Sequence, residues 1–330
     1  MNTPTGPNAR PLWQRLLVRR LKFLGIIAGL AIVGLGGSYL VAPQLLLKGH
    51  VAWEAMNAQL ETRSVQVGDT NWVYYEGGQG PTIVLLHGFA ANKDVWLKVA
   101  PILTPHFHVI IPDLPGWGES SRVAGASYNI DSQAARLSNF LDAVNAHHIL
   151  LVGHSMGGAI AGVYASEHPD NVIELALVDS LGLKFKENDF AKEALAGTDP
   201  FIFNDRAGFE RATSLAFENV PNIPGRFIDV FVKDNIKNRA FIESTFKELR
   251  DNSQALALQD RLDKLTMPVL GLWCHDDKII DISALDTLRD GLTHSPAIST
   301  SIINGCNHMP QMEKPQQFTQ ILTNFALAHQ

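Results

Sequence analysis

The stretch "LLVGHSMGGAI" carries the strongest chemical signal in the chain. It contains the pattern G-x-S-x-G as Gly153, Ser155 and Gly157, placed between an apolar strand-like run and a helical pattern. A tight turn from strand to helix strains the backbone of the serine and exposes its hydroxyl at the edge of a sheet, as in a nucleophile elbow. We therefore predict that Ser155 is a nucleophile. The competing interpretation is a turn of small residues without chemistry.

A serine nucleophile needs a general base, and the base needs an acid that orients it. After an elbow of this kind the acid normally precedes the histidine in the chain. His308, in "INGCNHMPQME", follows an expected strand and precedes an expected helix, so it could turn back over the elbow. His168 ends the elbow helix, His294 lies in a polar turn and His329 lies at the C-terminus. His308 is the predicted base, and a surface loop histidine is the alternative.

The candidate acids follow two of the expected strands. Asp276, Asp277 and Asp281 lie beyond "VLGLWC", and Asp179 ends the strand "ALVDS". Spacing alone does not choose between Asp276 and Asp277. This cluster also resembles a set of metal ligands, but a triad needs one carboxylate only. Because the chain has no CxxC or HExxH spacing, we expect no metal and no cofactor.

The elements that must position these residues alternate along the chain. Short apolar runs are followed by helical patterns, which indicates an α/β fold with a mostly parallel central sheet and helices on both faces. The expected strands span 72–78, 82–88, 108–113, 148–155, 172–180, 269–274 and 297–305. The expected helices span 94–103, 131–144, 156–169, 282–292 and 316–328. We predict one core formed by residues 65–182 and 266–330.

Between these two parts, residues 183–265 carry a purely helical pattern, and we predict that they form a helical cap, or lid. A lid over a hydrophobic acyl pocket would need many apolar side chains. The alternative is that these side chains pack the small core of the cap itself, which we expect for roughly half of them. Ten of the 16 phenylalanines fall in this segment: Phe185, Phe190, Phe201, Phe203, Phe209, Phe217, Phe227, Phe231, Phe241 and Phe246.

The N-terminal segment differs in kind from the rest. Residues 23–42 are apolar and uncharged, and they are long enough to cross the hydrocarbon layer of a membrane. We predict a transmembrane helix over 23–46 and a linker over 47–64. Arg10, Arg15, Arg19, Arg20 and Lys22 precede the apolar run, whereas only Lys48 follows it closely.

By the positive-inside rule, this charge distribution predicts that residues 1–22 are cytoplasmic and that the catalytic domain is exported to the periplasm or the outside. The competing interpretation is a signal peptide whose apolar region ends near Gly36 and which is cleaved after export.

The net charge limits the classes of partner that this protein can bind, and the two cysteines depend on the compartment in which it folds. The formal net charge of −6 and the absence of a basic stripe argue against nucleic acid as a partner. Cys274 and Cys306 lie just before the candidate acid and base, on strands expected to be neighbours. In an exported domain the two could form a disulfide; otherwise they are two buried thiols.

Taken together, these motifs resemble the α/β-hydrolase superfamily. The segments are "LLHGF" at 85–89, "PDLPGWGESS" at 112–121, "GHSMGG" at 153–158, "LWCHDD" at 272–277 and "GCNHMP" at 305–310, and the likeness covers 65–330. With "HGFAANKDVW", "DKIIDISALDTL" and the N-terminal apolar segment, the chain looks like membrane-anchored monoacylglycerol lipases of the α/β-hydrolase domain-containing type, and like related bacterial lipases.

The resemblance implies roles for further residues. In the family pattern W-G-x-x-D the last residue is the acid, which selects Asp277; here Cys274 replaces the usual glycine. The backbone N–H groups of Phe89 and Met156 are implied as the oxyanion hole, which binds the charge of the tetrahedral intermediate. Asp113 is interpreted as part of a structural turn.

We therefore expect a serine carboxylic-ester hydrolase that acts on lipid esters, most simply a lipase or monoacylglycerol lipase, through Ser155, His308 and Asp277. A serine at the elbow argues against the dehalogenase and epoxide-hydrolase branches, which use an aspartate. Two alternatives stay open. One is a serine hydrolase of the same fold that cleaves carbon–carbon bonds in ring-fission products, since those enzymes also carry S-M-G-G. The other is a non-catalytic, membrane-tethered receptor or scaffold.

Overall fold

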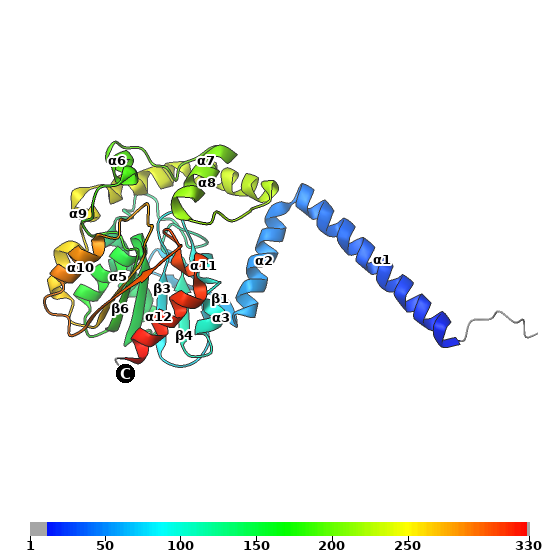
Figure 1. The fold of residues 1–330 in the computed structure, drawn as a ribbon, viewed down its shortest axis with the longest axis horizontal. Coiled ribbons are helices and arrows are strands. Elements are labelled where there is room, and N and C mark those ends of the chain that lie inside the picture. Colours follow the sequence, from blue (N-terminus) through cyan, green and yellow to red (C-terminus); the bar gives the residue numbers. More distant parts are fainter. Residues whose placement is uncertain (1–11, 329–330) are drawn as a thin grey trace, which may run out of the picture.

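An eight-stranded, mostly parallel sheet forms the centre of the protein in the computed structural model, which describes residues 12–328 (Figure 1). Its strand order is β1-β2-β4-β3-β5-β6-β7-β8. The first two strands are antiparallel to each other, β2 is antiparallel to β4, and the other pairs are parallel. The strands are β1 (Leu60–Val67), β2 (Thr70–Gly77), β3 (Thr82–Leu86), β4 (His108–Pro112), β5 (Ile149–His154), β6 (Val172–Val178), β7 (Val269–Cys274) and β8 (Ile298–Ile303).

Helices cover both faces of this sheet, as predicted. All residues of β5 and β7 are buried, which requires the continuous apolar runs seen in the sequence. On β5, Leu151 points into one core and Leu150 into the other. The first core is shared by α4 (Ile130–Ala143), α5 (Met156–Glu167), α10 (Ala284–Gly291) and the 3₁₀ helix η2 (Gln259–Lys264); the second is shared by η1 (Lys93–Trp96), α3 (Ala100–Leu103) and α12 (Pro315–Leu327).

The predicted helical insertion lies over one end of the strands of the sheet, at the top of the view in Figure 1. It consists of α6 (Asp189–Leu195), α7 (Arg206–Ala216), α8 (Gly225–Leu249) and α9 (Asn252–Ala255). Polar side chains cap three of its helices: Asn188 accepts the N–H of Ala191, Asp205 accepts the N–H of Gly208, and Asp251 accepts the N–H of Ser253. Such caps satisfy donors that have no partner inside the helix.

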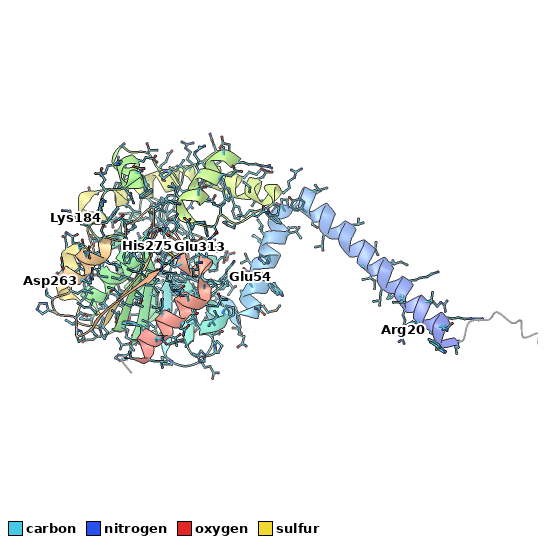
Figure 2. All side chains as sticks on the ribbon, viewed as in Figure 1. Arg20, Glu54, Lys184, Asp263, His275 and Glu313 are labelled. Carbon is cyan, nitrogen blue, oxygen red and sulfur yellow. A yellow bond between two sulfur atoms is a disulfide. The ribbon has the colours of Figure 1, made fainter. Side chains whose placement is uncertain are left out.

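At the N-terminus, α1 (Leu12–Val41) extends away from the body, and α2 (Pro43–Asn57) returns the chain to it (Figure 1). The apolar part of α1 has a mean hydropathy of 2.0 and is exposed, so by length and composition the helix could cross a membrane or serve as a signal sequence. Arg20 lies toward the far end of α1, and Glu54 lies on α2 beside the body (Figure 2). Arg10, in the predicted basic segment 1–22, lies outside the described residues.

The structure differs from the sequence predictions in three places. The predicted span 23–46 crosses a break after Val41, where Pro43 starts a new helix because its ring cannot continue the previous one. The predicted linker 47–64 holds most of α2 and the start of β1. The helix expected over 94–103 is split into η1 and α3, with Pro101 in the first turn of α3.

Candidate active site

Ser155 occupies the turn between β5 and α5, with φ of 52° and ψ of −119°. A positive φ is costly for a residue other than glycine, by about 1–3 kcal/mol, so the surroundings must enforce it. The motif glycines permit that packing. A Cβ on Gly153 would lie 2.2 Å from the carbonyl oxygen of Gly157, and one on Gly157 would lie 2.5 Å from that of His87. The strained elbow expected from G-x-S-x-G is therefore present.

His308 and Asp277 form a buried pair in this part of the structure. His308 Nδ1 lies 2.8 Å from Asp277 Oδ2, and the two side chains are 6% and 0% exposed. The other carboxylate oxygen, Oδ1, accepts the N–H groups of Ile279 and Ile280 at 2.8 and 3.0 Å. Because a carboxylate only accepts, the proton belongs on Nδ1 of the imidazole, which leaves the Nε2 lone pair free to act as a base.

The other acids beyond β7 have different surroundings. Asp276 is exposed, and its Oδ1 lies 2.8 Å from Nδ1 of the exposed His275. The Asp281 carboxylate accepts the N–H of Ser283 ahead of α10. Of the two aspartates that spacing left open, Asp277 is the one in contact with His308.

Three links hold the loop of Asp277 to the loop of His308. Cys274 and Cys306 form a disulfide, with their Cα atoms 5.4 Å apart. The N–H of Lys278 donates to Asn307 Oδ1 at 2.9 Å. The third link is the contact between Asp277 and His308. The question of whether the two cysteines pair is thus answered by the structure.

Glu313 connects the base loop to the cap. One of its carboxylate oxygens accepts the N–H of Asn307, and the other accepts the N–H groups of Glu218 and Asn219, which follow α7. In Figure 2 the labelled Glu313 and His275 lie between the sheet and the cap helices. The N–H of His308 itself donates to the carbonyl of Ala216 at 3.0 Å. The position of the base is therefore coupled to the cap.

His154, immediately before the serine, also holds the base in place. Its Nε2 lies 2.6 Å from the carbonyl oxygen of His308, and the two rings are 4.8 Å apart between centroids. Burial lowers the pKa of His154 well below its ordinary value, so the ring is neutral and donates through Nε2–H. This residue is the variable position of G-x-S-x-G, and the motif gives no signal for it.

The loop that carries Phe89 runs beside the elbow. A Cβ on Gly88 would lie 3.0 Å from both His154 Nδ1 and Ser155 Cβ, so only glycine fits without displacing them. His87 shapes this loop: its Nε2 accepts the N–H of Leu114, and its Nδ1 donates to the carbonyl of Gly88. Burial lowers the pKa of His87, which keeps the ring neutral for that role.

A buried lysine, which sequence analysis missed, anchors the same loop. Lys93 Nζ lies 2.7 Å from Asp113 Oδ2 and 2.7 Å from Glu119 Oε2. The N–H groups of Lys93 and Glu119 also donate to the Asp113 carboxylate. Asp113 is therefore a structural hub, as the turn interpretation expected. The only sequence signal for Lys93 was its place in "HGFAANKDVW".

Aromatic side chains of the cap pack on the core next to the site. The ring of Phe89 lies 5.7 Å from that of Phe246 and 6.2 Å from that of Phe201, and Trp117 lies 4.9 Å from Phe241. Other phenylalanines pack on each other within the cap: Phe203 on Phe209, and Phe209 on Phe231. The phenylalanines of this segment therefore divide into those that pack on the core beside Phe89 and Trp117 and those that pack within the cap.

Comparison with known proteins agrees with this geometry. A family profile described as alpha/beta hydrolase fold matches residues 81–315. The chain belongs to the α/β-hydrolase fold family. This α/β hydrolase is 27% identical to the monoacylglycerol lipase ABHD6 of Bos taurus over 91% of its own length and 93% of that protein. It is 28% identical to Lipase 1 of Psychrobacter immobilis over 90% and 94% of the two chains.

A solved structure is similar over nearly the whole chain. The crystal structure of a membrane phospholipase A, described as a bacterial virulence factor, is 32% identical to this α/β hydrolase, with a TM-score of 0.82, and the match covers 94% of this chain and 99% of the other.

Proposed function

We propose that this α/β hydrolase is a serine carboxylic-ester hydrolase of lipid esters, a lipase or monoacylglycerol lipase, with Ser155, His308 and Asp277 as its triad. The observation that carries the proposal is the buried contact between His308 Nδ1 and Asp277 Oδ2, on the loops that meet the strained Ser155 elbow. The names of the relatives, monoacylglycerol lipase ABHD6, Lipase 1 and membrane phospholipase A, support the same reaction class.

In the first half of the reaction, Ser155 Oγ attacks the ester carbonyl carbon and His308 Nε2 accepts the hydroxyl proton. Asp277 stabilises the imidazolium that forms and holds its ring. The tetrahedral intermediate collapses, the bond to the alcohol oxygen breaks, and His308 returns its proton to the leaving alcohol. In the second half, water attacks the acyl carbon and His308 Nε2 accepts a proton from it. The bond from the acyl carbon to Ser155 Oγ then breaks, His308 returns the proton to Oγ, and the carboxylic acid leaves.

The negative charge of the tetrahedral oxygen needs fixed donors. Met156 is the first residue of α5, so its N–H has no intrahelical acceptor. The N–H of Phe89 lies on the loop that passes over Ser155 Cβ at Gly88. We assign these two donors to the oxyanion hole, where each is worth about 3–4 kcal/mol in the barrier.

The substrate class follows from the aromatic contacts. Phe89, Phe201, Phe246, Trp117 and Phe241 place apolar surface directly beside the oxyanion loop. An acyl chain gains free energy from leaving water for such a surface, by about 0.8 kcal/mol per methylene group, and a small hydrophilic ester does not. An anchor that keeps the enzyme at a bilayer also favours lipid esters.

The test is a substrate panel on the full chain beside Ser155→Ala. The panel contains monoacylglycerols, triacylglycerols, diacyl phospholipids and nitrophenyl esters of increasing chain length. We expect monoacylglycerol hydrolysis that Ser155→Ala abolishes, with nitrophenyl ester turnover rising from short to medium chains. Preferential cleavage of a vinylogous diketone over every ester would favour the carbon–carbon bond hydrolase instead, and equal turnover by wild type and Ser155→Ala would refute the proposal.

We further propose that α1 is an uncleaved anchor and that the catalytic domain is exported. Arg15, Arg19, Arg20 and Lys22 lie at the start of the helix, which favours a cytoplasmic N-terminus. The disulfide between Cys274 and Cys306 suits an oxidising compartment. Tyr39, near the end of α1, packs edge-on against Phe227 of the cap and accepts the N–H of Arg226 at 3.4 Å. Cleavage after Ala42, beyond the apolar region, would remove Tyr39 and with it this packing.

Two measurements test this topology. The intact mass of the membrane-bound protein should include residues 1–36, and a mass that begins after them would identify a signal peptide. A reporter that folds only in an oxidising compartment should be active when fused after Gln330, and a reporter that folds only in the cytoplasm should be inactive there. The opposite pair of results would reverse the orientation.

A further inference from the structure

A second aspartate lies buried beside the proposed acid. Asp179 follows β6, where sequence analysis had kept it as a rival to the aspartates beyond β7. Its backbone has a φ of 42°, its N–H donates to the carbonyl of Leu272 at 3.0 Å, and its Oδ1 accepts the N–H of Cys274 at 2.8 Å. Two hydrogen bonds to β7 therefore hold this carboxyl at the end of the sheet, next to the disulfide.

The carboxyl of Asp179 faces the triad. Asp277 contacts His308 through Nδ1, and Asp179 approaches the same ring. One oxygen of Asp179 and ring nitrogens of His154 and His308 lie within 4.8 Å of one another. Oδ2 of Asp179 is fully buried and receives no hydrogen bond from the residues that the structure describes. A buried oxygen of this kind needs a partner, since leaving it unpaired costs about 1–3 kcal/mol.

A proton shared between the two carboxyls satisfies this oxygen. Two neighbouring buried carboxylates cannot both stay ionised at modest cost, so one of them retains its proton. Asp277 already accepts two backbone N–H groups and His308 Nδ1–H, which all favour its charged form. Asp179 accepts one backbone N–H only. Burial, and then the charge of Asp277, raise the pKa of Asp179 well above its ordinary value, with Glu313 adding to the effect.

We propose that Asp179 is a positioning residue for the triad: as a neutral acid it donates a hydrogen bond to Asp277, and when Asp277 is removed it ionises and becomes the acceptor for His308 Nδ1–H. This inference rests on the proposed function. The ionisation is expected because removing Asp277 removes the second cause of the raised pKa of Asp179, after burial, and leaves His308 Nδ1–H as a new donor that favours the charged form. In wild type the pair carries one charge and one proton, and only Asp277 contacts the imidazole.

The replacement Asp179→Asn is the informative single variant. Its amide group can donate to Asp277 as the neutral acid does, and its carbonyl oxygen can still accept the N–H of Cys274. We expect kcat/KM of this variant to fall by less than that of Asp277→Ala, because Asp277 keeps its contacts to His308 and to the backbone. It cannot ionise, so it cannot replace Asp277.

The test compares wild type, Asp179→Asn, Asp277→Ala and the double variant on one nitrophenyl ester between pH 5 and 9. We expect Asp277→Ala to keep at least about tenfold more activity than the double variant. Activity falls at low pH in both variants because the base takes up a proton, so the two profiles are compared as a ratio. We expect the ratio of the activity of Asp277→Ala to that of the double variant to fall toward one at low pH, as Asp179 becomes protonated. A residue with a merely structural role would give a ratio that does not change with pH.

Equal kcat/KM values for Asp277→Ala and the double variant at all pH values would overturn the proposal. So would a loss in Asp179→Asn alone as large as that in Asp277→Ala. Thermal unfolding checks that each variant folds, and Asp277→Asn with its own double variant replaces the alanine pair if that pair does not fold. Ser155→Ala in the same assay tests the proposed function separately. If only the Asp179 proposal is wrong, wild type still hydrolyses the ester and Ser155→Ala does not. If the proposed function is wrong, the two proteins have equal activity.

Discussion

Breaking the disulfide between Cys274 and Cys306 should cost stability more than it costs catalysis. We consider the double replacement Cys274→Ala/Cys306→Ala in the full chain. The two cysteines are separated by 32 positions, and both side chains are fully buried. Closing a loop of that length removes chain entropy from the unfolded state worth about 3.7 kcal/mol at 25 °C. For a protein of this size that loss corresponds to a fall in melting temperature of about 7 °C.

Activity at 25 °C should fall less, since two other links remain between the loops. Asp277 still contacts His308, and the N–H of Lys278 still donates to Asn307. We expect kcat/KM of the folded double variant to stay within about tenfold of wild type.

The assay is urea unfolding in detergent with and without dithiothreitol. Reductant should destabilise wild type by an amount close to the effect of the double replacement, and it should leave the double variant unchanged. The reasoning is refuted if the free energies of unfolding of wild type and the double variant without reductant differ by less than about 1 kcal/mol. It is also refuted if unfolded wild type without reductant titrates with two free thiols.

Three further predictions concern the supports of the site. Lys93→Met should lower the free energy of urea unfolding by roughly 3–5 kcal/mol, because it leaves the Asp113 carboxylate buried without its cation. The control Glu119→Gln, at a side chain 60% exposed, should lower it by less than about 1 kcal/mol. Equal effects of the two replacements would contradict the structural role of Asp113. Gly153→Ala should abolish the yield of folded protein, because its Cβ would lie 2.2 Å from the Gly157 carbonyl oxygen. The control Gly49→Ala on α2, whose Cβ would meet nothing within 4 Å, should fold normally. Normal folding of both variants would refute the packing argument. Burial raises the pKa of Asp199 in the cap to about 6, above its unfolded value, so this group lowers the stability of wild type as pH rises from 4 to 7. Melting curves should show that the free energy of unfolding of Asp199→Asn rises relative to that of wild type by up to about 3 kcal/mol across that range. A difference that stays constant with pH would contradict the assignment.

The residues predicted from the sequence are those with local patterns. Ser155 lies in a motif whose Gly153 is required by a contact only four residues away, with the Gly157 carbonyl, so this part of the motif and the elbow imply each other. Gly157 is required by a distant contact, with the carbonyl of His87. The strands could be predicted because a sheet covered on both faces needs continuous apolar runs, such as β5. The edge strand β1 has no such requirement: most of its side chains are exposed, and its polar sequence was interpreted as linker.

The supports of the site could not be predicted, because they arise from contacts between distant segments. Lys93 meets Glu119, His154 meets the carbonyl of His308, and Asp179 approaches the His308 ring only after the strands have assembled in the order of the sheet. Spacing identified both Asp179 and Asp277 as strand-end acids. It could not indicate that both lie near His308, with Asp277 alone in contact with Nδ1 among the described residues.

Labelling with a fluorophosphonate tests the central claim most directly. The reagent forms a covalent bond with a serine only where a base activates the hydroxyl and donors stabilise the resulting oxyanion. The account predicts one label per chain, mapped by peptide mass spectrometry to Ser155, with ester hydrolysis lost in proportion to labelling and with no label on Ser155→Ala. Full hydrolysis after complete labelling, or a label on another residue that blocks activity, would contradict it.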